Sequence, residues 1–388
     1  MEIIYIANAR IPTEKAHGLQ IMKMGESFSS AGAAVELILP TRVNSPEFKG
    51  VDPFLHYKIK KVFGVKRVKC FDPVFLAESS AGTYIKFQAF FFFLSLFFYL
   101  LFKKNKKDCI FYTRDEYLLP LIHLFSKKVV WECHALPQNK DFYAKNINAL
   151  SHLIVLTGKM KEELVKSGVD EKKILISPDA VDLDIFNIKL DRDEARKELG
   201  LPTDKTILGY TGSFKTKGMD KGIAVILEAL KIVLQDRKDV IFIAVGGSAE
   251  DIEYYQSLAK NIGVSELVML LGAVDQRRLA VYQKAFDLLL MPFPQKKHYA
   301  YFMSPLKMFE YMAAKRPIIA SNLPSIREIL DDDSALFVEP DSSISLAEGI
   351  DFCLKDGNFC DKISGGAFVR VQNYTWSKRA EEIINFIK

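Results

Sequence analysis

The sequence has few of the residues that build metal centres and disulfide frameworks. Its 388 residues include five cysteines, and no two stand at the short spacing of a zinc or disulfide motif. This scatter argues against both kinds of site and fits a reducing compartment. The six histidines add no recognisable metal-ligand cluster. The sequence therefore predicts no metal. The cysteines are Cys70, Cys109, Cys133, Cys353 and Cys360.

A strong excess of charge of one sign is also missing. The 53 Lys and Arg residues are nearly matched by 48 Asp and Glu residues, which leaves a formal net charge of +5. A nucleic-acid partner is therefore not expected. A strand-like run begins at Glu2, so no signal peptide is expected, and the expected location is cytoplasmic.

Two nucleotide-binding signatures are incomplete. The loop after the first expected strand has Gly18 as its single glycine, whereas a dinucleotide fingerprint needs three. An oxidoreductase cofactor is therefore not expected. His17-Gly18 either places an amide near a phosphate or belongs to an ordinary loop. In the loop at 212–218, Lys217 precedes Gly218, whereas a nucleotide-triphosphatase loop has its lysine after the second glycine. That loop either binds a diphosphate through its lysine or is flexible with solvated lysines.

A long apolar run occupies residues 87–102, with the sequence FQAFFFFLSLFFYLLF. Lys86 precedes it, and the lysine-rich stretch 103–107 follows it. A membrane-spanning helix needs about 20 apolar residues, so the run is short for a span. Three interpretations stay open: a buried helix of an α/β domain, a helix that brings 87–107 to an anionic membrane surface, and a true span.

Short apolar runs alternate with amphipathic stretches along the whole chain. This alternation predicts an α/β protein with parallel sheets covered on both faces. Because the pattern occurs twice, we expect two doubly wound domains, at 1–190 and 200–372, joined by the polar stretch 187–204 with a short helix at 192–199. The expected strands are 2–8, 35–40, 109–113, 128–132, 152–156, 173–177, 206–212, 240–247, 268–274, 287–293, 317–322 and 335–340. The expected long helices include 18–31, 219–236 and 249–262.

The most informative segment is 304–310, SPLKMFE, which opens a helix. Ser304 suits a helix cap and Pro305 suits the first turn. The free amides and the dipole of such a helix end favour an anion. Lys307 and Glu310 share one helix face, where a cation suits a phosphate and a carboxylate suits ribose hydroxyls. The alternative is a capped helix with a surface Lys–Glu pair.

Polar residues follow other strands at the edge where α/β sheets bind ligands. His134 follows the strand at 128–132, although a lone histidine is more often structural. Gly246-Gly247-Ser248 follows the strand at 240–247 and opens a helix. These glycines allow either a close approach of ligand to backbone or a simple tight turn.

Taken together, the segments resemble the nucleotide-sugar glycosyltransferases of family four, also called group 1. The resemblance runs over nearly the whole chain, is strongest at 206–330 and is weaker through 41–108. The order and spacing of the segments are specific, whereas each one alone is weak. The segments are 17–32, 131–137, 152–164, 177–186, 210–218, 245–247, 271–293 and 304–330.

The resemblance implies the GT-B fold, in which two Rossmann-like domains face a central cleft. It implies a retaining transfer from a nucleoside-diphosphate sugar, which is a co-substrate, without a cofactor or metal. The apolar run at 87–102 and its lysines indicate a sugar or lipid-linked glycan acceptor, as in envelope polysaccharide or glycolipid synthesis at the inner face of the membrane. The last helix, 375–388, is expected to cross back onto the first domain.

The resemblance also assigns roles to residues. Lys217 is expected to neutralise the donor diphosphate and Glu310 to hold the ribose. His134 is expected near the transferred sugar. The amides around Ser304 and Leu306 are expected to face the phosphate or sugar. The remaining expected donor contacts are Gly18 near the diphosphate, Val274 beside the base, and Gly212, Ser213, Gly246, Gly247, Pro305 and Lys307.

Three positions depart from the family pattern. Phe302 stands where the first glutamate of the family's paired motif is expected, eight residues before Glu310. Ser213 replaces an arginine, and His17-Gly18 replaces a glycine pair. Two alternatives to a transferase stay open: an epimerase or phosphorylase on the same fold, and a non-catalytic subunit, which the three departures motivate.

Overall fold

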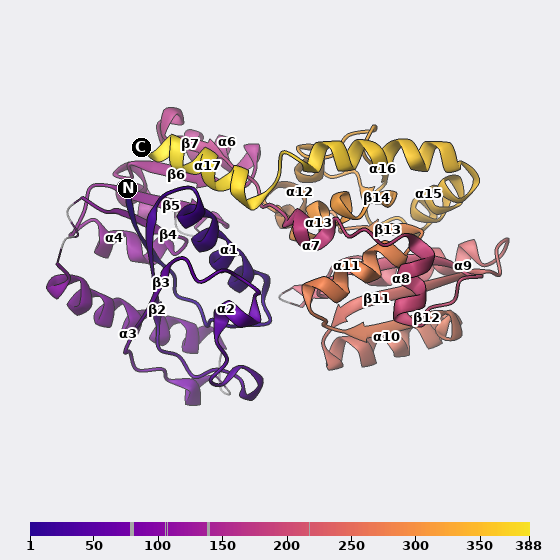
Figure 1. Ribbon diagram of the computed structural model, residues 1–388, viewed down its shortest axis with the longest axis horizontal. Coiled ribbons are helices and arrows are strands. Elements are labelled where there is room, and N and C mark those ends of the chain that lie inside the picture. Colours follow the sequence, from indigo (N-terminus) through magenta and orange to yellow (C-terminus); the bar gives the residue numbers. More distant parts are fainter. Residues whose placement is uncertain (78–80, 105, 107, 138–139, 217) are drawn as a thin grey trace. The chain divides into compact units, whose positions relative to one another are not determined.

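The computed structural model describes residues 1–77, 81–104, 106, 108–137, 140–216 and 218–388 (Figure 1). The chain divides into two compact units. The first comprises Met1–Pro178 and Trp376–Lys388, and the second comprises Asp179–Thr375. Residues 179–190, expected in the first domain, thus lie in the second unit, where Phe186 is buried in the core and Leu183 packs against it.

The described part of the first unit forms a seven-stranded parallel sheet in the order β3-β2-β1-β4-β5-β6-β7. Its central strands are almost fully buried, as expected of a parallel sheet that is covered on both faces. The strands are β1 (Glu2–Ile6), β2 (Ala34–Pro40), β3 (Gly64–Val68), β4 (Ile110–Thr113), β5 (Val129–Cys133), β6 (His152–Val155) and β7 (Ile174–Ile176).

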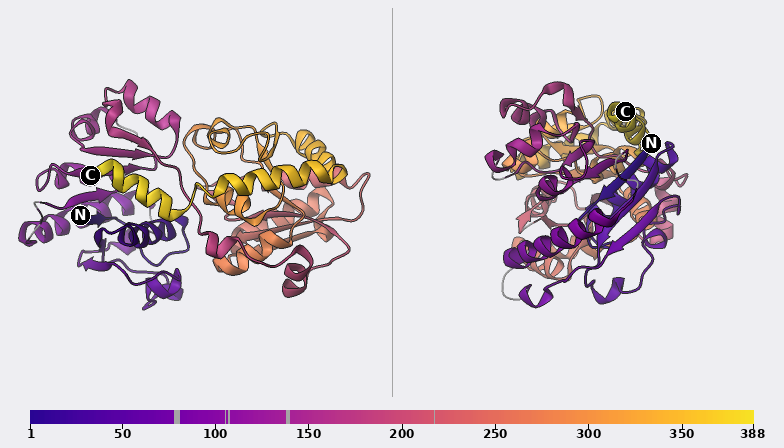
Figure 2. Two further views of the ribbon diagram at one scale, coloured as in Figure 1. Left: turned by 45° about the horizontal axis from the view of Figure 1, so that its top comes forward. Right: turned by 90° about the vertical axis from the view of Figure 1, so that its left-hand side faces the viewer.

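Helices connect these strands. The last helix of the chain packs against α1, and Figure 2 shows the two side by side, α17 in yellow and α1 in indigo. The helices are α1 (Ala16–Ser30), α2 (Pro53–His56), α3 (Ala81–Phe102), α4 (Leu119–Ile122), α5 (Lys140–Asn148), α6 (Gly158–Lys166) and α17 (Trp376–Ile387). Short 3-10 turns lie at η1 (Pro46–Phe48), η2 (Val74–Leu76), η3 (Glu116–Leu118) and η4 (Glu171–Lys173).

The second unit contains, within its described residues, a six-stranded parallel sheet in the order β12-β11-β8-β13-β14-β15, and a small antiparallel pair, β9 with β10. The strands are β8 (Thr206–Thr211), β9 (Lys215–Thr216), β10 (Met219–Asp220), β11 (Val240–Gly247), β12 (Val268–Gly272), β13 (Leu288–Met291), β14 (Ile318–Ser321) and β15 (Leu336–Val338).

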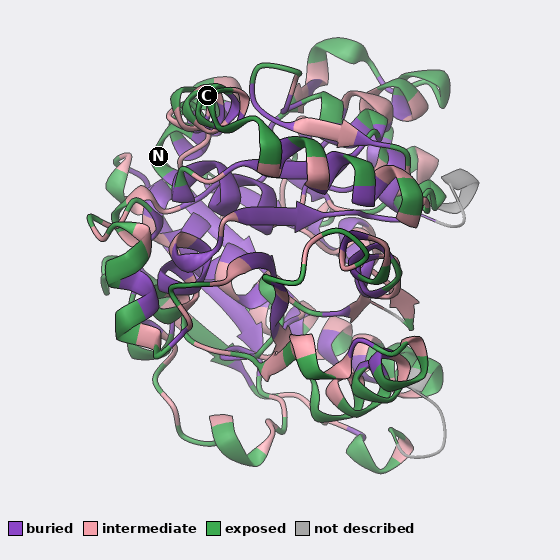
Figure 3. Ribbon diagram, turned by 90° about the vertical axis from the view of Figure 1, so that its right-hand side faces the viewer, coloured by how far each residue is buried: buried purple, intermediate pink, exposed green. Residues whose placement is uncertain are grey.

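Successive residues of these strands point to opposite faces of the sheet and fill two apolar layers. On β8, Ile207 joins one layer, whereas Leu208 and Tyr210 join the other. Figure 3 shows the buried strands in purple and the exposed outer faces of helices in green. The helices are α7 (Leu183–Phe186), α8 (Arg192–Leu199), α9 (Ile223–Val233), α10 (Ala249–Ile262), α11 (Gln276–Ala285), α12 (Lys297–Tyr301), α13 (Leu306–Ala314), α14 (Pro324–Arg327), α15 (Ser343–Lys355) and α16 (Gly357–Val371), with one 3-10 turn, η5 (Ser265–Leu267).

Both sheets have the doubly wound order in which the chain starts near the middle and reverses direction once. The reversal falls between β1 and β4 in the first unit and between β8 and β13 in the second. The predicted α/β class with two doubly wound domains is confirmed. In such sheets, ligands bind beyond the carboxyl ends of the strands at the reversal.

Two local predictions were wrong. The helix expected at 219–236 begins only at Ile223, because Met219 and Asp220 pair with Thr216 and Lys215 in a hairpin. No strand was expected at 64–68, where β3 pairs with β2 at the edge of the first sheet. An edge strand needs fewer apolar residues, and β3 carries exposed Lys66 and Arg67.

Candidate functional site

A buried lysine occupies the reversal point of the second sheet. Lys307 lies in the first turn of α13, and its Nζ atom is 3.4 Å from the centroid of the Tyr210 ring on β8. The same atom is 5.4 Å from the centroid of the Phe293 ring, which follows β13. Lys307 therefore holds its charge-bearing group at the carboxyl ends of the two strands where ligands bind in this fold.

This lysine lacks a polar partner among the described residues. Lys307 is 7% exposed, and its Nζ atom makes no hydrogen bond there. Burial pushes the pKa of Lys307 well below its ordinary value, and the nearby charge of Lys221 adds to this, while Glu310 and Asp220 oppose it. The aromatic faces stabilise a cation only in part. Three unsatisfied donors in a buried place are suited to an incoming anion.

Two glycines shape the backbone next to Lys307. Gly212 follows β8 with φ of +101°, and a Cβ atom there would lie 3.3 Å from Cε of Lys307. Gly246 near the end of β11 has φ of +119°, and a Cβ atom there would lie 2.8 Å from the carbonyl of Gly212. The two strand ends thus meet backbone to backbone, which no larger side chain allows. Gly247 packs directly against the Phe214 ring, where a Cβ atom would lie 2.4 Å from a ring carbon.

A second lysine that the sequence analysis missed lies beside the first. Lys221 lies two residues before the start of α9, and its Nζ atom donates a 2.7 Å hydrogen bond to Oγ of Ser213. Burial lowers the pKa of Lys221 to about 8. The next residue, Gly222, has φ of +101°, and a Cβ atom there would lie 2.1 Å from the carbonyl oxygen of Pro292 after β13. Lys221 is therefore held at the same reversal point as Lys307.

Lys217, the residue predicted to neutralise the diphosphate, lies outside the described residues. Among the described residues of this loop, Lys221, four positions later in the sequence, lies close enough to Lys307 to affect its pKa. A signal existed in the sequence, because Lys221-Gly222 stands directly before the apolar face of α9, formed by Ile223, Ile226, Leu227 and Leu230.

Glu310 lies one helical turn after Lys307. It is 9% exposed, and its Oε2 atom accepts a 3.2 Å hydrogen bond from Nε2 of Gln283, which also donates to Oγ1 of Thr211 at 2.9 Å. Burial raises the pKa of Glu310 to about 7, against the opposing effects of the Gln283 hydrogen bond and the Lys307 charge. The alternative of a surface Lys–Glu pair is therefore wrong, because both side chains are buried.

The predicted helix cap is also wrong. The helix α13 begins at Leu306, and Pro305 occupies the cap position without a side-chain hydrogen bond. The Oγ atom of Ser304 instead accepts a 2.8 Å hydrogen bond from the backbone N–H of Asp179. Ser304 thus fastens the start of the second unit to the loop before α13, while Pro305 and Leu306 remain partly exposed.

Two further positions flank this group. Val274 comes two residues after β12, at the same edge of the sheet, and packs in part against the core. Phe302, at the end of α12, is partly exposed, and its ring centroid lies 6.0 Å from Nζ of Lys297. An aromatic ring therefore replaces the carboxylate that the family pattern expects.

In the first unit, His134 is held by a buried carboxylate. Its Nε2 atom lies 2.8 Å from Oε1 of Glu132 on β5, and the His134 side chain is 20% exposed. Burial by itself would raise the pKa of Glu132, but Arg379, His134 and Arg114 hold it well below its ordinary value. Glu132 also accepts hydrogen bonds from Gln20 at 2.7 Å and Tyr112 at 2.5 Å. The orientation of His134 is thus fixed by a saturated polar network.

Gly18 serves a packing role. It is the third residue of α1, and a Cβ atom there would lie 2.3 Å from Oη of Tyr57 and 2.6 Å from Cγ2 of Thr13. The neighbouring His17 is neutral at pH 7, because burial, with Arg114 and Lys15, lowers its pKa to about 4. A contact between Gly18 and a diphosphate stays a prediction.

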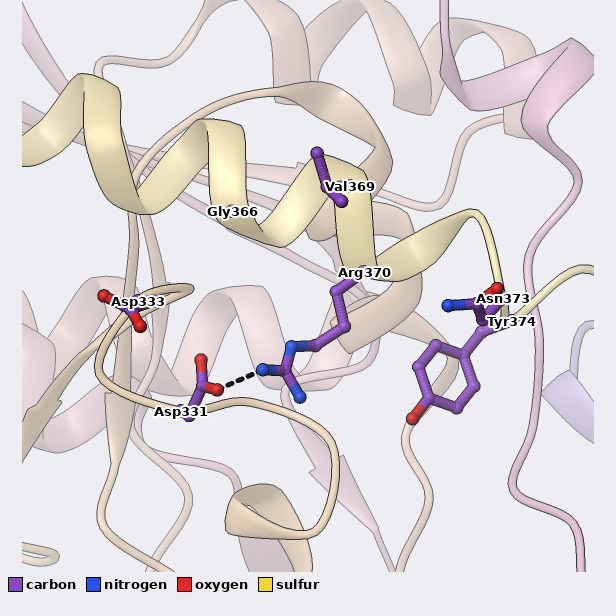
Figure 4. Close-up of a pocket in the computed structure, with 7 residues that line it drawn as sticks. All are labelled: Asp331, Asp333, Gly366, Val369, Arg370, Asn373 and Tyr374. Atoms are coloured by element: carbon purple, nitrogen blue, oxygen red, sulfur yellow. Dashed lines mark hydrogen bonds and ion pairs between the residues drawn. The ribbon is translucent and has the colours of Figure 1, made fainter.

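A separate pocket of about 480 Å³ in the second unit contains none of the candidate donor residues. Figure 4 shows Asp331 and Arg370, which form an ion pair at this pocket. Its lining residues are Asp331, Asp333, Gly366, Val369, Arg370, Asn373 and Tyr374. Within the described part of the chain, no group of three or more His, Cys, Asp and Glu residues is arranged to hold a metal ion.

The structure therefore brings together one set of the predicted residues at the second reversal point. Two cations there suit a diphosphate, and a carboxylate one turn further suits a diol such as ribose. His134 and Gly18 belong to the first unit. The set consists of Gly212, Ser213, Gly246, Lys307 and Glu310, joined by Lys221.

Comparison with known proteins gives a family for the second unit. Residues 191–368 match the family model described as "Glycosyl transferases group 1". A D-inositol 3-phosphate glycosyltransferase of Xylanimonas cellulosilytica is 25% identical over 257 residues. That alignment covers 64% of this chain and 60% of the relative, so the chain spans less than two thirds of the relative's length.

Solved structures show the same fold over the whole chain. Sucrose-phosphate synthase from Thermosynechococcus elongatus has a TM-score of 0.74 at 17% identity, and 99% of this chain and 97% of that chain are covered. HepE of Anabaena in complex with UDP-glucose has a TM-score of 0.69 at 16% identity, with 99% and 98% covered. The predicted GT-B fold is confirmed by these neighbours. The predicted resemblance to the group 1 glycosyltransferases is thus found at residues 191–368, the part of the chain that the family model matches.

Proposed function

We propose that this protein transfers a sugar from a nucleoside-diphosphate sugar to an acceptor hydroxyl, with retention of the anomeric configuration. One observation carries the proposal. The buried Nζ atom of Lys307 lies at the reversal point without a polar partner among the described residues, beside Lys221 and one turn from Glu310. The UDP-glucose complex of HepE, a protein of the same fold, supports a donor of this class.

The chemical demand of the reaction matches these cations. The bond between the anomeric carbon and the diphosphate oxygen breaks, and negative charge builds on the leaving phosphate. Lys307 and Lys221 would stabilise that charge, and their positions are fixed before the donor arrives. The acceptor oxygen attacks on the face that the diphosphate leaves, and its proton passes to a phosphate oxygen. No protein nucleophile and no metal are assigned.

Glu310 would accept hydrogen bonds from the ribose hydroxyls. A diphosphate next to Lys307 favours its protonated form, and the resulting charge favours the ionised form of Glu310. Donor binding would thus restore charge to both side chains of this pair. His134, oriented by Glu132, is proposed to orient the transferred sugar.

The acceptor is proposed to be a sugar or a lipid-linked glycan of envelope polysaccharide or glycolipid synthesis. The protein is proposed to act in the cytoplasm at the inner face of the membrane. The support is a set of five cysteines with no disulfide between them, which suits a reducing compartment, and the lysine-flanked apolar helix α3.

A thermal-shift screen over uridine, guanosine and adenosine diphosphate sugars tests donor binding, because a ligand that binds the native state raises the unfolding temperature. We expect one nucleotide to stabilise the protein and the Lys307→Met variant to lose the shift. Incubation of that labelled donor with and without an acceptor then separates transfer from epimerisation.

A non-catalytic subunit is the second candidate function, and Phe302 in place of a carboxylate favours it. The absence of any shift with every nucleotide sugar, in a protein that unfolds cooperatively, would support the subunit and refute the transferase.

A further inference from the structure

The helix α3 of the first unit has two apolar faces, and only one of them is covered. Its inner face consists of Phe92, Leu96 and Leu100, which are four residues apart and completely buried. Its outer face repeats every three to four residues and is between 42% and 58% exposed. The outer residues are Phe87, Phe90, Leu94, Phe98 and Leu101. An ordinary surface helix carries polar residues on its outer side, so this face is built for a partner.

Apolar side chains from outside the helix enlarge this surface. Phe71, which is 57% exposed, packs against Phe91 of α3 with ring centroids 5.0 Å apart. Phe75 in η2 is 67% exposed, and η2 contacts α3. The outer face of α3, with Phe71 and Phe75, is called the α3 surface below. Its aromatic residues are phenylalanines, apolar anchors that suit the boundary between the headgroups and acyl chains of a membrane.

The charges around the α3 surface are mostly positive, although Asp72 accepts a hydrogen bond from Tyr84 of α3 and Glu36 forms an ion pair with Lys103. The helix α3 contains no Asp or Glu, and Lys86, in the helix itself, is exposed. At the other end, Lys103 and Lys106 are partly exposed and Lys104 is exposed. The neighbouring strand β3 adds exposed Lys66 and Arg67. A rim of cations around an apolar surface complements the anionic headgroups of a bilayer.

A membrane span is a poorer explanation. The 22 residues of α3 extend about 33 Å, which is enough to cross a bilayer, and α3 is the candidate span among the described residues. A spanning helix, however, would have to leave the unit. Phe92, Leu96 and Leu100 would then lose their core contacts, and the sheet edge beneath them would be exposed to water.

A second copy of the chain is also a poorer partner. In a symmetric dimer the same surface faces itself, so Lys86, Lys104 and their copies would approach one another without nearby carboxylates on α3. We propose that the α3 surface docks the protein on an anionic lipid bilayer, with α3 lying in the headgroup region along the membrane plane. The proposal does not depend on the donor site.

Vesicle sedimentation tests this docking. Vesicles of phosphatidylcholine alone and vesicles with added phosphatidylglycerol are each mixed with the full-length protein. We expect strong sedimentation with the anionic vesicles, weak sedimentation with neutral ones, and loss of binding at high salt. The Phe90→Gln/Phe98→Gln variant should bind the anionic vesicles at least about tenfold more weakly, because two apolar anchors are removed.

Two controls make the result specific. The matched variant Leu55→Gln changes a residue of the same unit that is 78% exposed on α2 and should bind like the parent protein. Lys86→Glu/Lys104→Glu should weaken anionic binding and leave any neutral binding unchanged. Unfolding temperatures of all variants should match, since every changed residue is on the surface.

Several results would overturn the proposal. These are absence of anionic binding by the parent protein, equal binding by the Phe90→Gln/Phe98→Gln variant, and resistance of the membrane-bound protein to alkaline wash, which would indicate a span. A dimer in solution that Phe90→Gln/Phe98→Gln dissociates, without vesicle binding, would show that a second copy covers the α3 surface.

Discussion

Arg379 of α17 donates a 2.8 Å hydrogen bond to the Glu132 carboxylate of β5, and both side chains are almost completely buried. The two residues are 247 positions apart in the sequence. Arg379 also donates to the carbonyl oxygens of Ser177 and Pro178, at the point where the chain leaves the first unit. The Arg379 guanidinium thus anchors α17 to the first unit and holds the backbone at Ser177 and Pro178, directly after β7. It also neutralises the Glu132 carboxylate that orients His134.

Removal of this cation is expected to be costly. Arg379→Met leaves the Glu132 charge buried without its main partner, and loss of one member of a buried ion pair costs about 3–5 kcal/mol. We expect the free energy of unfolding, measured by denaturant titration at pH 7, to fall by that amount. Lys378→Met, at the exposed neighbouring position, is the control and should change stability by less than about 0.5 kcal/mol. Equal stability of the two variants would contradict a structural role for the ion pair.

Substitution of the buried lysines at the second reversal point is expected to weaken UDP binding. For Lys307, this loss of affinity should come without a loss of stability. Lys307→Met removes a buried amine that lacks a polar partner among the described residues, and methionine fits similar space, so stability should rise or stay constant. Affinity for UDP, measured by calorimetry, should fall by about 30-fold or more, as for the loss of a charge-assisted contact. Lys221→Met should also weaken UDP binding.

The control is Lys215→Met, in the same loop. Lys215 lies 3.6 Å from Asp251 and over the Tyr254 ring, away from Lys307. Its removal should leave UDP affinity within about threefold of the parent value. A stronger effect from Lys215 than from Lys221 would show that the wrong lysine is assigned to the diphosphate.

The donor affinity is expected to depend on pH through Lys221. The pKa of Lys221 is about 8 because the side chain is buried, so the cation is present at pH 7 and is largely lost by pH 9. An ordinary lysine would keep its charge over this range. We expect UDP affinity to fall between pH 7 and 9 in the parent protein. In Lys221→Arg the fall should be smaller, because a guanidinium remains charged. Calorimetric titrations at three pH values would show this difference, and parallel curves would rule it out.

The sequence predicted the doubly wound units because buried parallel strands are continuous apolar runs, as in 240–247 and 287–293. It did not predict β3, whose exposed lysine and arginine at the sheet edge hide the strand pattern. It also did not predict the burial of Lys307 and Glu310. Charged residues normally face water, and only the packing of α13 beneath the strand ends shows that these two do not.

The sequence also did not predict Lys221 as a cation at the reversal point, for a related reason. A loop hairpin, β9 with β10, separates Gly212 from α9, and Lys221 follows this hairpin and returns to Ser213 beside the reversal point. The hairpin is set by pairing between Lys215–Thr216 and Met219–Asp220, which two-residue strands do not reveal in sequence. The close contact of Gly222 with Pro292, which holds Lys221 at the reversal point, is visible only in the folded structure.

The ionised form of Glu310 is expected to lower the stability of the native state, although its carboxylate is proposed to bind the donor ribose. Its pKa is raised to about 7 from an ordinary 4.5, so the native state holds a proton that the unfolded state releases. This contribution to stability is complete below pH 4.5 and is lost as the pH rises through 7. Glu310→Gln keeps the shape and cannot ionise. Its free energy of unfolding at pH 8 should therefore exceed that of the parent by roughly 3 kcal/mol, and the advantage should shrink by pH 5.

The same change removes the carboxylate that is proposed to hold the ribose. UDP affinity of Glu310→Gln should fall by about tenfold or more, although the protein is more stable. The control Glu348→Gln, at an exposed position of α15, should alter neither quantity. A stabilised variant with unchanged UDP affinity would support the cost of burying the ionised carboxylate, but it would show that Glu310 does not bind the donor. A destabilised variant at pH 8 would instead show that the ionised carboxylate supports the native state.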